Sequence, residues 1–384
     1  MTSPLKVTLL SNFGLPIRGV SPYSSMLLSA LKKYRDDFVV TAIDYRSAYP
    51  TFASPNPSAL DLDSDRKSDV HYASPKSWRK FCTEAEDVVH IQYWTQFGAY
   101  YLLYICKYLR KLGKKSILTV HNPVAHETLF LLGRFEKALF RSVDCVIVHT
   151  EKGAEILREA TANTEPPRVV VIPHGIKLVP AIEDKPQQSY ILMFGNIRKY
   201  KGTDILLDAW EQIFEDFPDY KLILAGRIWG QGGGMIRRFM NQLLGGSEFS
   251  SDILRRLSRA NEINIEPRIG FIEEEELDEL ILSASICVFP YREFSGQSGA
   301  ASLAAGAGIP IVTSDLPGLS ALNIDSTYIV SPLNPASLAK TLAECLKKDG
   351  ATARSLQREI AENYSWERVA KAHLELYREV ASVD

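Results

Sequence analysis

Two stretches in the second half of the chain pair a strand-like apolar run with a polar, glycine-containing turn. In the first, FGNIRKYKGTD, the run ends at Phe194, Gly195 lies in the turn, and Arg198 and Lys201 precede a helical pattern. Arginine binds phosphate through a bidentate fork and lysine as a point charge. Ligands of open α/β sheets bind beyond the carboxyl ends of the strands, so these two cations could clamp a diphosphate. A solvated basic turn is the alternative that this spacing leaves open.

The second stretch, FPYREFSGQSGAASLAAGAGIP, has a polar turn followed by a helix of small residues. A helix that starts near Ser298 offers unpaired N–H groups and the positive end of its dipole to an anion. Gly299 and the alanines from Ala300 onward would let a ligand approach the backbone closely. The alternative is a helix that needs small residues only to pack against its sheet.

These turns must be held by a larger α/β framework, because short β-branched runs alternate with helical patterns throughout the chain. We expect strands near Lys6–Leu10, Val39–Ile43, Val88–Ile91, Ser116–Val120, Cys145–Val148, Val169–Ile172, Ile191–Phe194, Leu222–Leu224, Cys287–Phe289, Ile309–Val312 and Tyr328–Val330. We expect helices near Ser24–Lys33, Gly202–Ile213, Glu275–Leu282, Ala300–Ala307 and Pro335–Lys348. Most strands are followed by a helical pattern, which predicts parallel sheets.

The chain of 384 residues is long enough for two domains of ordinary size. The polar, proline-containing segment Ala181–Gln188 precedes a renewed strand pattern, so we interpret it as the linker between two Rossmann-like halves, residues 1–180 and 189–364. Residues 47–76 and the glycine-rich residues 229–246 read as irregular segments, the first as a long surface loop.

The two turns together resemble the donor half of the family-four glycosyltransferases, which are retaining enzymes of the GT-B architecture. The first half of the chain is similar to the family as well, through a glycine at the acceptor-side loop, a histidine at a strand end, and a segment that closes the first domain. The matching pieces are Phe194–Gly202, Gly308-Ile309-Pro310, Tyr364–Tyr377, Gly19, His121 within TVHNP, and VIPHG at Val171–Gly175.

The resemblance implies an α/β fold with two Rossmann-like domains facing across a cleft, and a C-terminal helix, 365–384, that packs back on the first domain. It implies transfer of a sugar from a nucleotide-sugar, with UDP or GDP the most common bases, to a hydroxyl with retention. A sugar or a lipid-linked sugar would be the acceptor, in surface polysaccharide or glycolipid assembly. Neither a metal nor a further cofactor is implied.

The resemblance also implies roles for single residues. Arg198 and Lys201, beside Gly195, would neutralise the leaving diphosphate, and the backbone at Ser298, Gly299 and Ala300 would donate N–H groups to it. Gly19 would let the nucleotide-sugar approach the first domain, and His121 would lie beside the transferred sugar. In this family a phosphate oxygen is thought to take the proton of the acceptor hydroxyl.

Two departures from the family pattern stand out. Asn196 occupies the position after the turn glycine where family members usually have arginine. The Glu-x7-Glu pair is missing, because its two positions hold Ser295 and Leu303. Glu293 is a candidate to replace the first carboxylate, and Gln297 and Ser298 are further candidates to hold the sugar. The loss also motivates another reading, a catalytically silent scaffold or binding protein of the same fold; a GT-B epimerase or phosphorylase is the rival among enzymes.

Composition limits the other classes of function. Lys plus Arg total 44 against 46 for Asp plus Glu, which gives no global attraction to nucleic acid. The chain has no signal-peptide layout and no apolar run of the ~20 residues that cross a bilayer, and its five cysteines are unpatterned, so we expect a soluble cytoplasmic protein. The Asp61-x-Asp63 spacing resembles a metal–diphosphate motif but lies in a polar loop, and we interpret it as solvated.

Three further features have competing readings. The basic residues at the end of the apolar helical stretch 97–115 complement a helix dipole, or they touch an anionic membrane that presents a lipid-linked acceptor. His90, within VVHIQYW, either packs inside the protein or lines the acceptor cleft, with packing favoured. Thr150 is expected to cap the helix that follows it.

Overall fold

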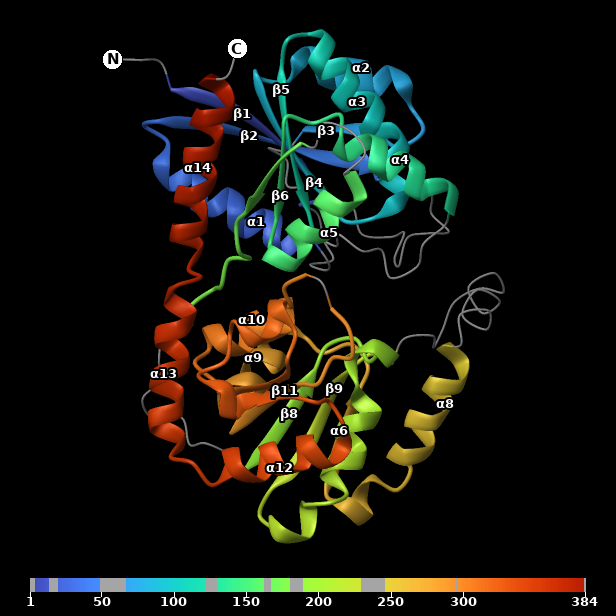
Figure 1. The fold of residues 1–384 in the computed structure, drawn as a ribbon, viewed down its shortest axis with the longest axis vertical. Helices are drawn as coiled ribbons and strands as arrows, with labels where there is room; N and C mark the ends of the chain where they lie inside the picture. The colour runs from blue at the N-terminus through green and yellow to red at the C-terminus, as the bar shows by residue number, and fades with distance from the viewer. Residues whose placement is uncertain are drawn as a thin grey trace. The chain divides into compact units, whose positions relative to one another are not determined.

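The computed structural model describes residues 4–13, 20–48, 67–121, 130–161, 167–179, 189–228, 246–294 and 296–382 of the chain (Figure 1). The chain forms two compact units. Unit 1 comprises Met1–Gly175, Ser295–Gln297 and Trp366–Asp384, and unit 2 comprises Ile176–Phe294 and Ser298–Ser365. The chain therefore passes between the units at Gly175–Ile176, Phe294–Ser295, Gln297–Ser298 and Ser365–Trp366.

Unit 1 contains a parallel sheet of seven strands in the order β3-β2-β1-β4-β5-β6-β7. The strands are β1 (Leu5–Ser11), β2 (Phe38–Ser47), β3 (Lys67–His71), β4 (Val88–Tyr93), β5 (Lys115–Val120), β6 (Cys145–Val148) and β7 (Arg168–Val171). The central strands are apolar and buried on both faces, which is the pattern of a sheet covered by helices on each side.

Helices cover both faces of this sheet. One apolar core lies between the sheet and α2 (Pro75–Glu84), α3 (Ala99–Lys111), α4 (Phe130–Phe140) and α5 (Glu151–Thr161). The other core lies between the sheet and α1 (Val20–Leu31) together with the C-terminal α14 (Trp366–Ser382), which packs beside α1 in Figure 1. Alternate residues of one strand serve the two cores: Val88 of β4 belongs to the second and Val89 to the first.

Unit 2 contains a parallel sheet of six strands in the order β10-β9-β8-β11-β12-β13. The strands are β8 (Tyr190–Phe194), β9 (Lys221–Gly226), β10 (Ile265–Ile269), β11 (Ile286–Phe289), β12 (Ile311–Ser314) and β13 (Ile329–Val330). One core involves α6 (Thr203–Trp210), α8 (Gly246–Leu257) and α12 (Pro335–Leu346). The other involves α9 (Glu274–Ser283), α10 (Gly299–Gly306), the short α11 (Pro317–Ser320) and α13 (Gly350–Glu362).

Six short 3₁₀ turns connect these elements within the described residues. They are Lys32–Tyr34, Gln96–Gly98, Lys199–Lys201, Phe214–Asp216, Ala260–Ile263 and Ser326–Tyr328.

The strand order reverses once in each sheet, between β1 and β4 in unit 1 and between β8 and β11 in unit 2. In such doubly wound sheets, loops on either side of the reversal turn away from each other and leave a crevice beyond the carboxyl ends of the strands. The expectation of two Rossmann-like units with parallel sheets is confirmed. In unit 2 the two singled-out turns follow β8 and β11, the two strands that flank this reversal.

Parts of the sequence interpretation were wrong or are not covered. Residues 47–76 are not one loop, because β3 pairs in parallel with β2 and α2 begins at Pro75. The edge strand β10 was missed because IEPRI contains charged residues and a proline, which edge strands tolerate. The helices α2, α4, α8 and α13 were not among the expected helices either. The linker 181–188, the loop 229–245 and Asp61 and Asp63 lie outside the described residues.

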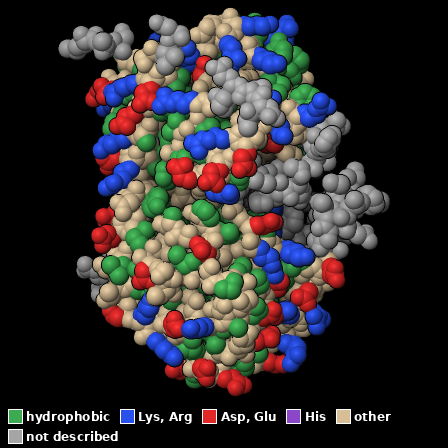
Figure 2. Space-filling model, in the orientation of Figure 1, with side chains coloured by type: hydrophobic (Ala, Val, Ile, Leu, Met, Phe, Trp, Pro, Cys, Tyr) green, Lys and Arg blue, Asp and Glu red, His purple; other side chains and the backbone are tan. Residues whose placement is uncertain are grey.

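No helix among the described residues is long and apolar enough to span a membrane. On the face shown in Figure 2, acidic and basic side chains are interspersed, in keeping with their near-equal numbers in the sequence. The described side chains on this face therefore offer no extended field of one sign to a highly charged polymer.

The return of the chain to unit 1 depends on a close contact between Gly175 and Trp366. A Cβ atom at Gly175 would lie 2.3 Å from the indole of Trp366. We expect Gly175→Ala to destabilise unit 1 by about 1–3 kcal/mol, the usual range for overpacking, measured by chemical denaturation. Gly133→Ala is the matched control: it adds the same methyl to α4, where nothing lies within 4 Å, and should stabilise by about 0.4–1 kcal/mol. Equal effects of the two substitutions would contradict this contact.

Candidate functional site

The first turn of unit 2 begins where β8 ends and is anchored to the neighbouring β9. Gly195 has a φ of +100°, its N–H donates to the carbonyl of Ala225, and the N–H of Ile197 donates to the carbonyl of Arg227. The approach is close, because a Cβ at Gly226 would lie 2.1 Å from the carbonyl oxygen of Gly195. Backbone hydrogen bonds and backbone packing alone therefore fix the conformation of this turn.

The Lys201 side chain is buried at the end of this turn, with only 9% of its surface exposed. Its ammonium lies 5.3 Å from the centre of the Tyr291 ring and close to Gly195, where a Cβ would be 3.2 Å away. Burial, together with the nearby Arg198, lowers the pKa of Lys201. Within the described part of the chain the ammonium has no hydrogen-bond partner, so three strong donors face the turn.

The second turn leads into α10 and places the start of this helix beside Tyr291. The helix starts near Ser298, as the sequence predicts, and Ser298 is its N-cap. The Ser298 hydroxyl accepts a hydrogen bond from the N–H of Ala301 and is bonded to the Tyr291 hydroxyl at 3.1 Å. The N–H groups of Gly299 and Ala300 come one turn too early for intrahelical partners. Gly299 is exposed and has open space around its Cβ position.

Arg292 ties the two turns together. Its guanidinium makes a bidentate ion pair with Asp204, at 2.8 and 2.6 Å, and also donates to the carbonyl of Lys199. Burial alone would raise the pKa of Asp204, but this guanidinium holds it below its ordinary value. The backbones are in contact too, because a Cβ at Gly202 would lie 2.0 Å from the carbonyl oxygen of Pro290. Lys201 and the start of α10 are therefore held on either side of Tyr291.

The other predicted residues of these turns differ in their surroundings. Glu293 is exposed and makes no hydrogen bond or ion pair within the described residues, and Arg292 pairs with Asp204 rather than with it. The Gln297 carboxamide oxygen accepts the backbone N–H of His174 at 2.6 Å. Arg198 is half-buried at the start of the first turn. Ser295 lies outside the described residues.

In unit 1, His121 follows β5 directly and joins a group of histidines. Its Nε2 lies 2.8 Å from the Gln92 carboxamide, and its Nδ1 lies 3.2 Å from Nε2 of His149. The ring of Tyr23 packs edge-on against His121, with centroids 4.7 Å apart, and also against His174. Gly19 lies outside the described residues. Both ring nitrogens of His121 are thus engaged within its own unit.

His90 is fully buried, so the packing interpretation is correct, but the residue is also hydrogen-bonded on both sides. It contacts the Tyr377 hydroxyl at 2.7 Å and Thr119 Oγ1 at 2.7 Å. Thr150 caps α5 as expected, since its hydroxyl accepts the N–H of Gly153.

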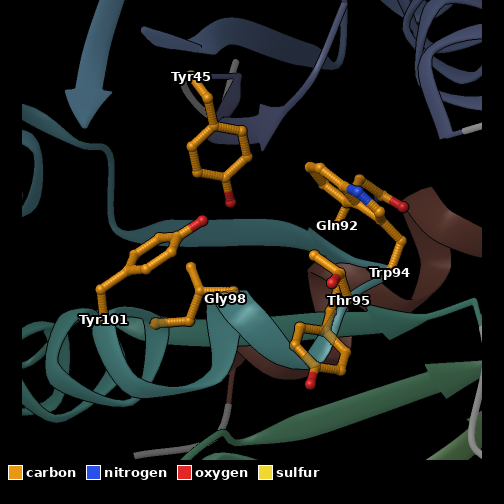
Figure 3. A pocket seen from close by; sticks show the side chains of 8 residues that line it. Tyr45, Gln92, Trp94, Thr95, Gly98 and Tyr101 are labelled. Atoms are coloured by element: carbon orange, nitrogen blue, oxygen red, sulfur yellow. The ribbon is translucent and has the colours of Figure 1, made fainter. Parts of the chain in front are cut away.

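A small hollow opens where β4 ends in unit 1 (Figure 3). It holds about 160 Å³ of space, part of it open to solvent, and is lined by Tyr45, Gln92, Trp94 and Tyr101 among others. In Figure 3 the hydroxyls of Tyr45 and Tyr101 point toward each other across it.

Several site residues escaped the sequence reasoning. Tyr291, Asp204 and Gln92 gave no motif signal, although Gln92 stands two residues after His90 and therefore on the same face of β4. Two of the basic residues at or just beyond the end of α3 donate to backbone carbonyls of adjacent segments of unit 1: Lys114 to Cys82 and Arg110 to Ser142. This favours a structural role for these two; Lys107 and Lys111 are exposed. Within the described residues, no three His, Cys, Asp or Glu side chains are placed so that they could hold a metal ion together.

Two protein-family models match consecutive parts of the chain. The model described as Glycosyltransferase Family 4 matches residues 18–179, and the model described as Glycosyl transferases group 1 matches residues 188–348. The two matches therefore cover most of unit 1 and most of unit 2.

Curated relatives are similar at low identity. An uncharacterised glycosyltransferase of Methanocaldococcus jannaschii is 23% identical over 324 residues, which are 76% of this chain and 75% of the relative. A D-inositol 3-phosphate glycosyltransferase of Corynebacterium urealyticum is 25% identical over 65% of this chain, an alignment that spans only 59% of that relative. A GDP-mannose:glycolipid 4-beta-D-mannosyltransferase of Xanthomonas campestris is 24% identical over 72% of each chain.

Solved structures share the fold over nearly the whole chain. A sucrose-phosphate synthase from Thermosynechococcus elongatus has a TM-score of 0.68 at 21% identity, covering 99% of this chain and 100% of its own. The Anabaena protein HepE, in complex with UDP and glucose, has a TM-score of 0.70 at 16% identity, covering 98% and 100%. These likenesses show that the chain has the GT-B fold.

The enclosed histidines of unit 1 generate a prediction about acid stability. Burial lowers the pKa of His149 to about 3 and those of His174 and His373 to about 4, and holds those of His90 and His121 well below the ordinary value. Below about pH 6.5 these histidines bind protons in the unfolded chain but stay neutral in the folded chain. Stability is therefore full above that pH and falls by up to about 1.4 kcal/mol per pH unit for each histidine below it.

Urea titrations at pH 8, 6.5 and 5.5 measure this loss. His373→Gln removes one of these histidines. It should reduce the loss of unfolding free energy between pH 6.5 and 5.5 by the contribution of one histidine, up to about 1.4 kcal/mol. An unfolding free energy that stays constant from pH 8 to 5.5 would show that these histidines do not remain neutral in the folded state.

Proposed function

The chain belongs to the family-four and group-1 glycosyltransferases and has their GT-B fold, and on this premise we propose that it transfers a sugar from a nucleotide-sugar to a hydroxyl acceptor with retention. The observation that carries the proposal is the buried Lys201 ammonium, which faces the turn after β8 while the start of α10 lies across Tyr291. A buried cation and unpaired helix N–H groups together favour an anion with several oxygens. The diphosphate of a nucleotide-sugar is such an anion.

The same groups would stabilise the leaving diphosphate during transfer. As the bond between sugar and phosphate breaks, negative charge develops on the phosphate oxygens, and fixed donors are most effective where charge develops. Lys201, Arg198 and the N–H groups of Gly299 and Ala300 would supply this stabilisation without a metal ion. A phosphate oxygen would then take the proton of the acceptor hydroxyl, so the reaction needs positioning more than a protein base.

The acceptor is proposed to be a sugar or a lipid-linked sugar in surface polysaccharide or glycolipid assembly. The relative that acts on a glycolipid supports this assignment, as does the UDP complex of HepE for a nucleotide donor. UDP and GDP are the bases we propose. The exposed Lys107 and Lys111 on α3 are the residues that would touch an anionic membrane surface.

Incubation with a panel of nucleotide-sugars tests the function directly. Release of nucleoside diphosphate that depends on an acceptor, and a product with the donor's anomeric configuration by proton NMR, are the expected results. An inverted product would contradict retention. A protein that binds no nucleoside diphosphate would match the scaffold reading instead.

Lys201→Ala should cost about 1.5–3 kcal/mol of donor binding, the range for hydrogen bonds to charged groups, and slow transfer ~10-fold or more. Arg198→Ala should act in the same direction. Lys199→Ala is the matched control, since Lys199 is an exposed lysine of the same turn and should leave transfer unchanged. Calorimetric titration of donor measures the effect. Wild-type donor affinity in both Lys201→Ala and Arg198→Ala would refute the phosphate clamp.

Glu293→Gln tests whether this carboxylate has taken over from the missing pair. If Glu293 stabilises positive charge on the sugar ring, turnover should fall ~100-fold with little change in donor affinity, because such electrostatic groups are typically worth roughly 2.7–4 kcal/mol. Its exposure leaves the side chain able to reach a bound sugar. Turnover within a few-fold of wild type would leave Gln297 and the backbone of α10 as the sugar's partners.

A further inference from the structure

A continuous chain of hydrogen bonds runs through the interior of unit 1. Tyr377 of α14 contacts His90, His90 contacts Gln92 at 3.1 Å, Gln92 contacts His121, and His121 contacts His149. The chain ends at a backbone carbonyl, because Nδ1 of His149 lies 2.9 Å from the oxygen of Ile172. Gln92 is its centre and is 0% exposed.

The carbonyl end decides where the protons lie. A carbonyl only accepts, so His149 must carry its proton on Nδ1. If His149 is neutral, its Nε2 accepts, and the proton between the two rings belongs to Nδ1 of His121. A neutral His121 then needs a donor at its Nε2.

Gln92 can supply that donor in one of two orientations. With its oxygen toward His121, His121 must donate from Nε2 as well, and three protons are then shared by two imidazoles, which leaves a positive charge in the interior. Turning the carboxamide by 180° exchanges its nitrogen and oxygen, which occupy equivalent positions. The nitrogen then donates to His121. The Nε2–H of His90 is shared between the Gln92 oxygen and Thr119 Oγ1, which lies 2.7 Å away, and Nδ1 of His90 accepts the Tyr377 hydroxyl. Every group in the chain is satisfied and neutral.

The surroundings favour the neutral arrangement. Among the residues that the structure describes, the groups that face His121 are Tyr23 of α1, Gln92 and, beyond it, His90 of β4, His149 after β6 and His174 after β7. None of these is a carboxylate that would hold a proton on the imidazole. Burial and the neighbouring histidines keep the pKa of His121 well below its ordinary value.

We propose that Gln92 is a positioning residue that donates from its amide nitrogen to Nε2 of His121, accepts from His90, and so holds His121 as the neutral Nδ1–H form with no free lone pair. The proposal rests on the proposed function and on the family resemblance, which implies that His121 lies beside the transferred sugar. His121 then serves as a fixed, uncharged surface for that sugar and takes no proton from the acceptor. This fits a reaction in which the leaving phosphate is the base.

Nuclear magnetic resonance reads the proton positions without any activity. In the wild-type protein with ¹⁵N-labelled histidine, long-range ¹H–¹⁵N spectra at pH 7 should show His121 protonated on Nδ1 alone, and unchanged down to about pH 5. A His121 protonated on Nε2, or one that titrates near its ordinary pKa of about 6.5, would overturn the proposal whatever the enzyme transfers.

Two substitutions that keep the size of the Gln92 side chain nearly constant distinguish its positioning role from a simple packing role. Gln92→Glu replaces the donor with a buried carboxylate that only accepts, which should raise the pKa of His121 and give it a second proton at pH 7. Gln92→Met removes both hydrogen bonds and should leave His121 a mixture of forms. In both, kcat should fall about tenfold or more while KM changes less than about threefold.

Gln357→Met is the matched control, because Gln357 is a fully buried glutamine of unit 2 whose amide donates to the carbonyl of Leu322. It should lower stability as Gln92→Met does but leave the His121 spectrum and kcat unchanged. Equal loss of kcat in Gln92→Met and Gln357→Met, or a His121 spectrum unaltered in Gln92→Glu, would overturn the positioning role. If a Gln92 variant does not fold, the wild-type spectrum alone decides.

Discussion

A buried lysine ammonium is the constraint on which the candidate site of unit 2 depends. Taking an ammonium out of water is costly unless it gains partners, and Lys201 gains the face of Tyr291 but no hydrogen bond within the described residues. A favourable anion would offset that cost, which is why the site is interpreted as a diphosphate site. The surroundings serve to keep the cation in place: the Arg292–Asp204 pair and the Gly202–Pro290 contact fix the two turns against each other.

The fold supplies the rest of this geometry. The order of strands in unit 2 places the turns after β8 and β11 side by side, because these two strands are neighbours at the reversal of the sheet. This arrangement brings together residues that are distant in sequence: Lys201 and Ser298 are far apart along the chain, and both contact Tyr291. In unit 1 the same topology brings Gln92, His121 and His149 together from successive strands β4, β5 and β6.

Much of this organisation could be predicted from the sequence, because apolar runs, glycines and small-residue helices are local signals. The parallel strands, the start of a helix near Ser298 and the buried His90 are examples. Other features are invisible locally. The Arg292–Asp204 pair joins residues 88 positions apart, and β10 owes its place to pairing with β9 rather than to its own polar sequence. Gln92 acquires its importance only from partners on other strands and on α14.

The difference in affinity between a nucleoside diphosphate and its nucleoside tests the central claim most directly. Calorimetric titration of the wild-type protein with UDP, uridine, GDP and guanosine isolates what the diphosphate contributes. The account predicts that one of the two diphosphates binds at least ~100-fold more tightly than its own nucleoside, since two charged hydrogen bonds of about 1.5–3 kcal/mol each are at stake. Equal affinities within each pair, or no binding of either diphosphate, would contradict the assignment of Lys201 and the start of α10 to a diphosphate.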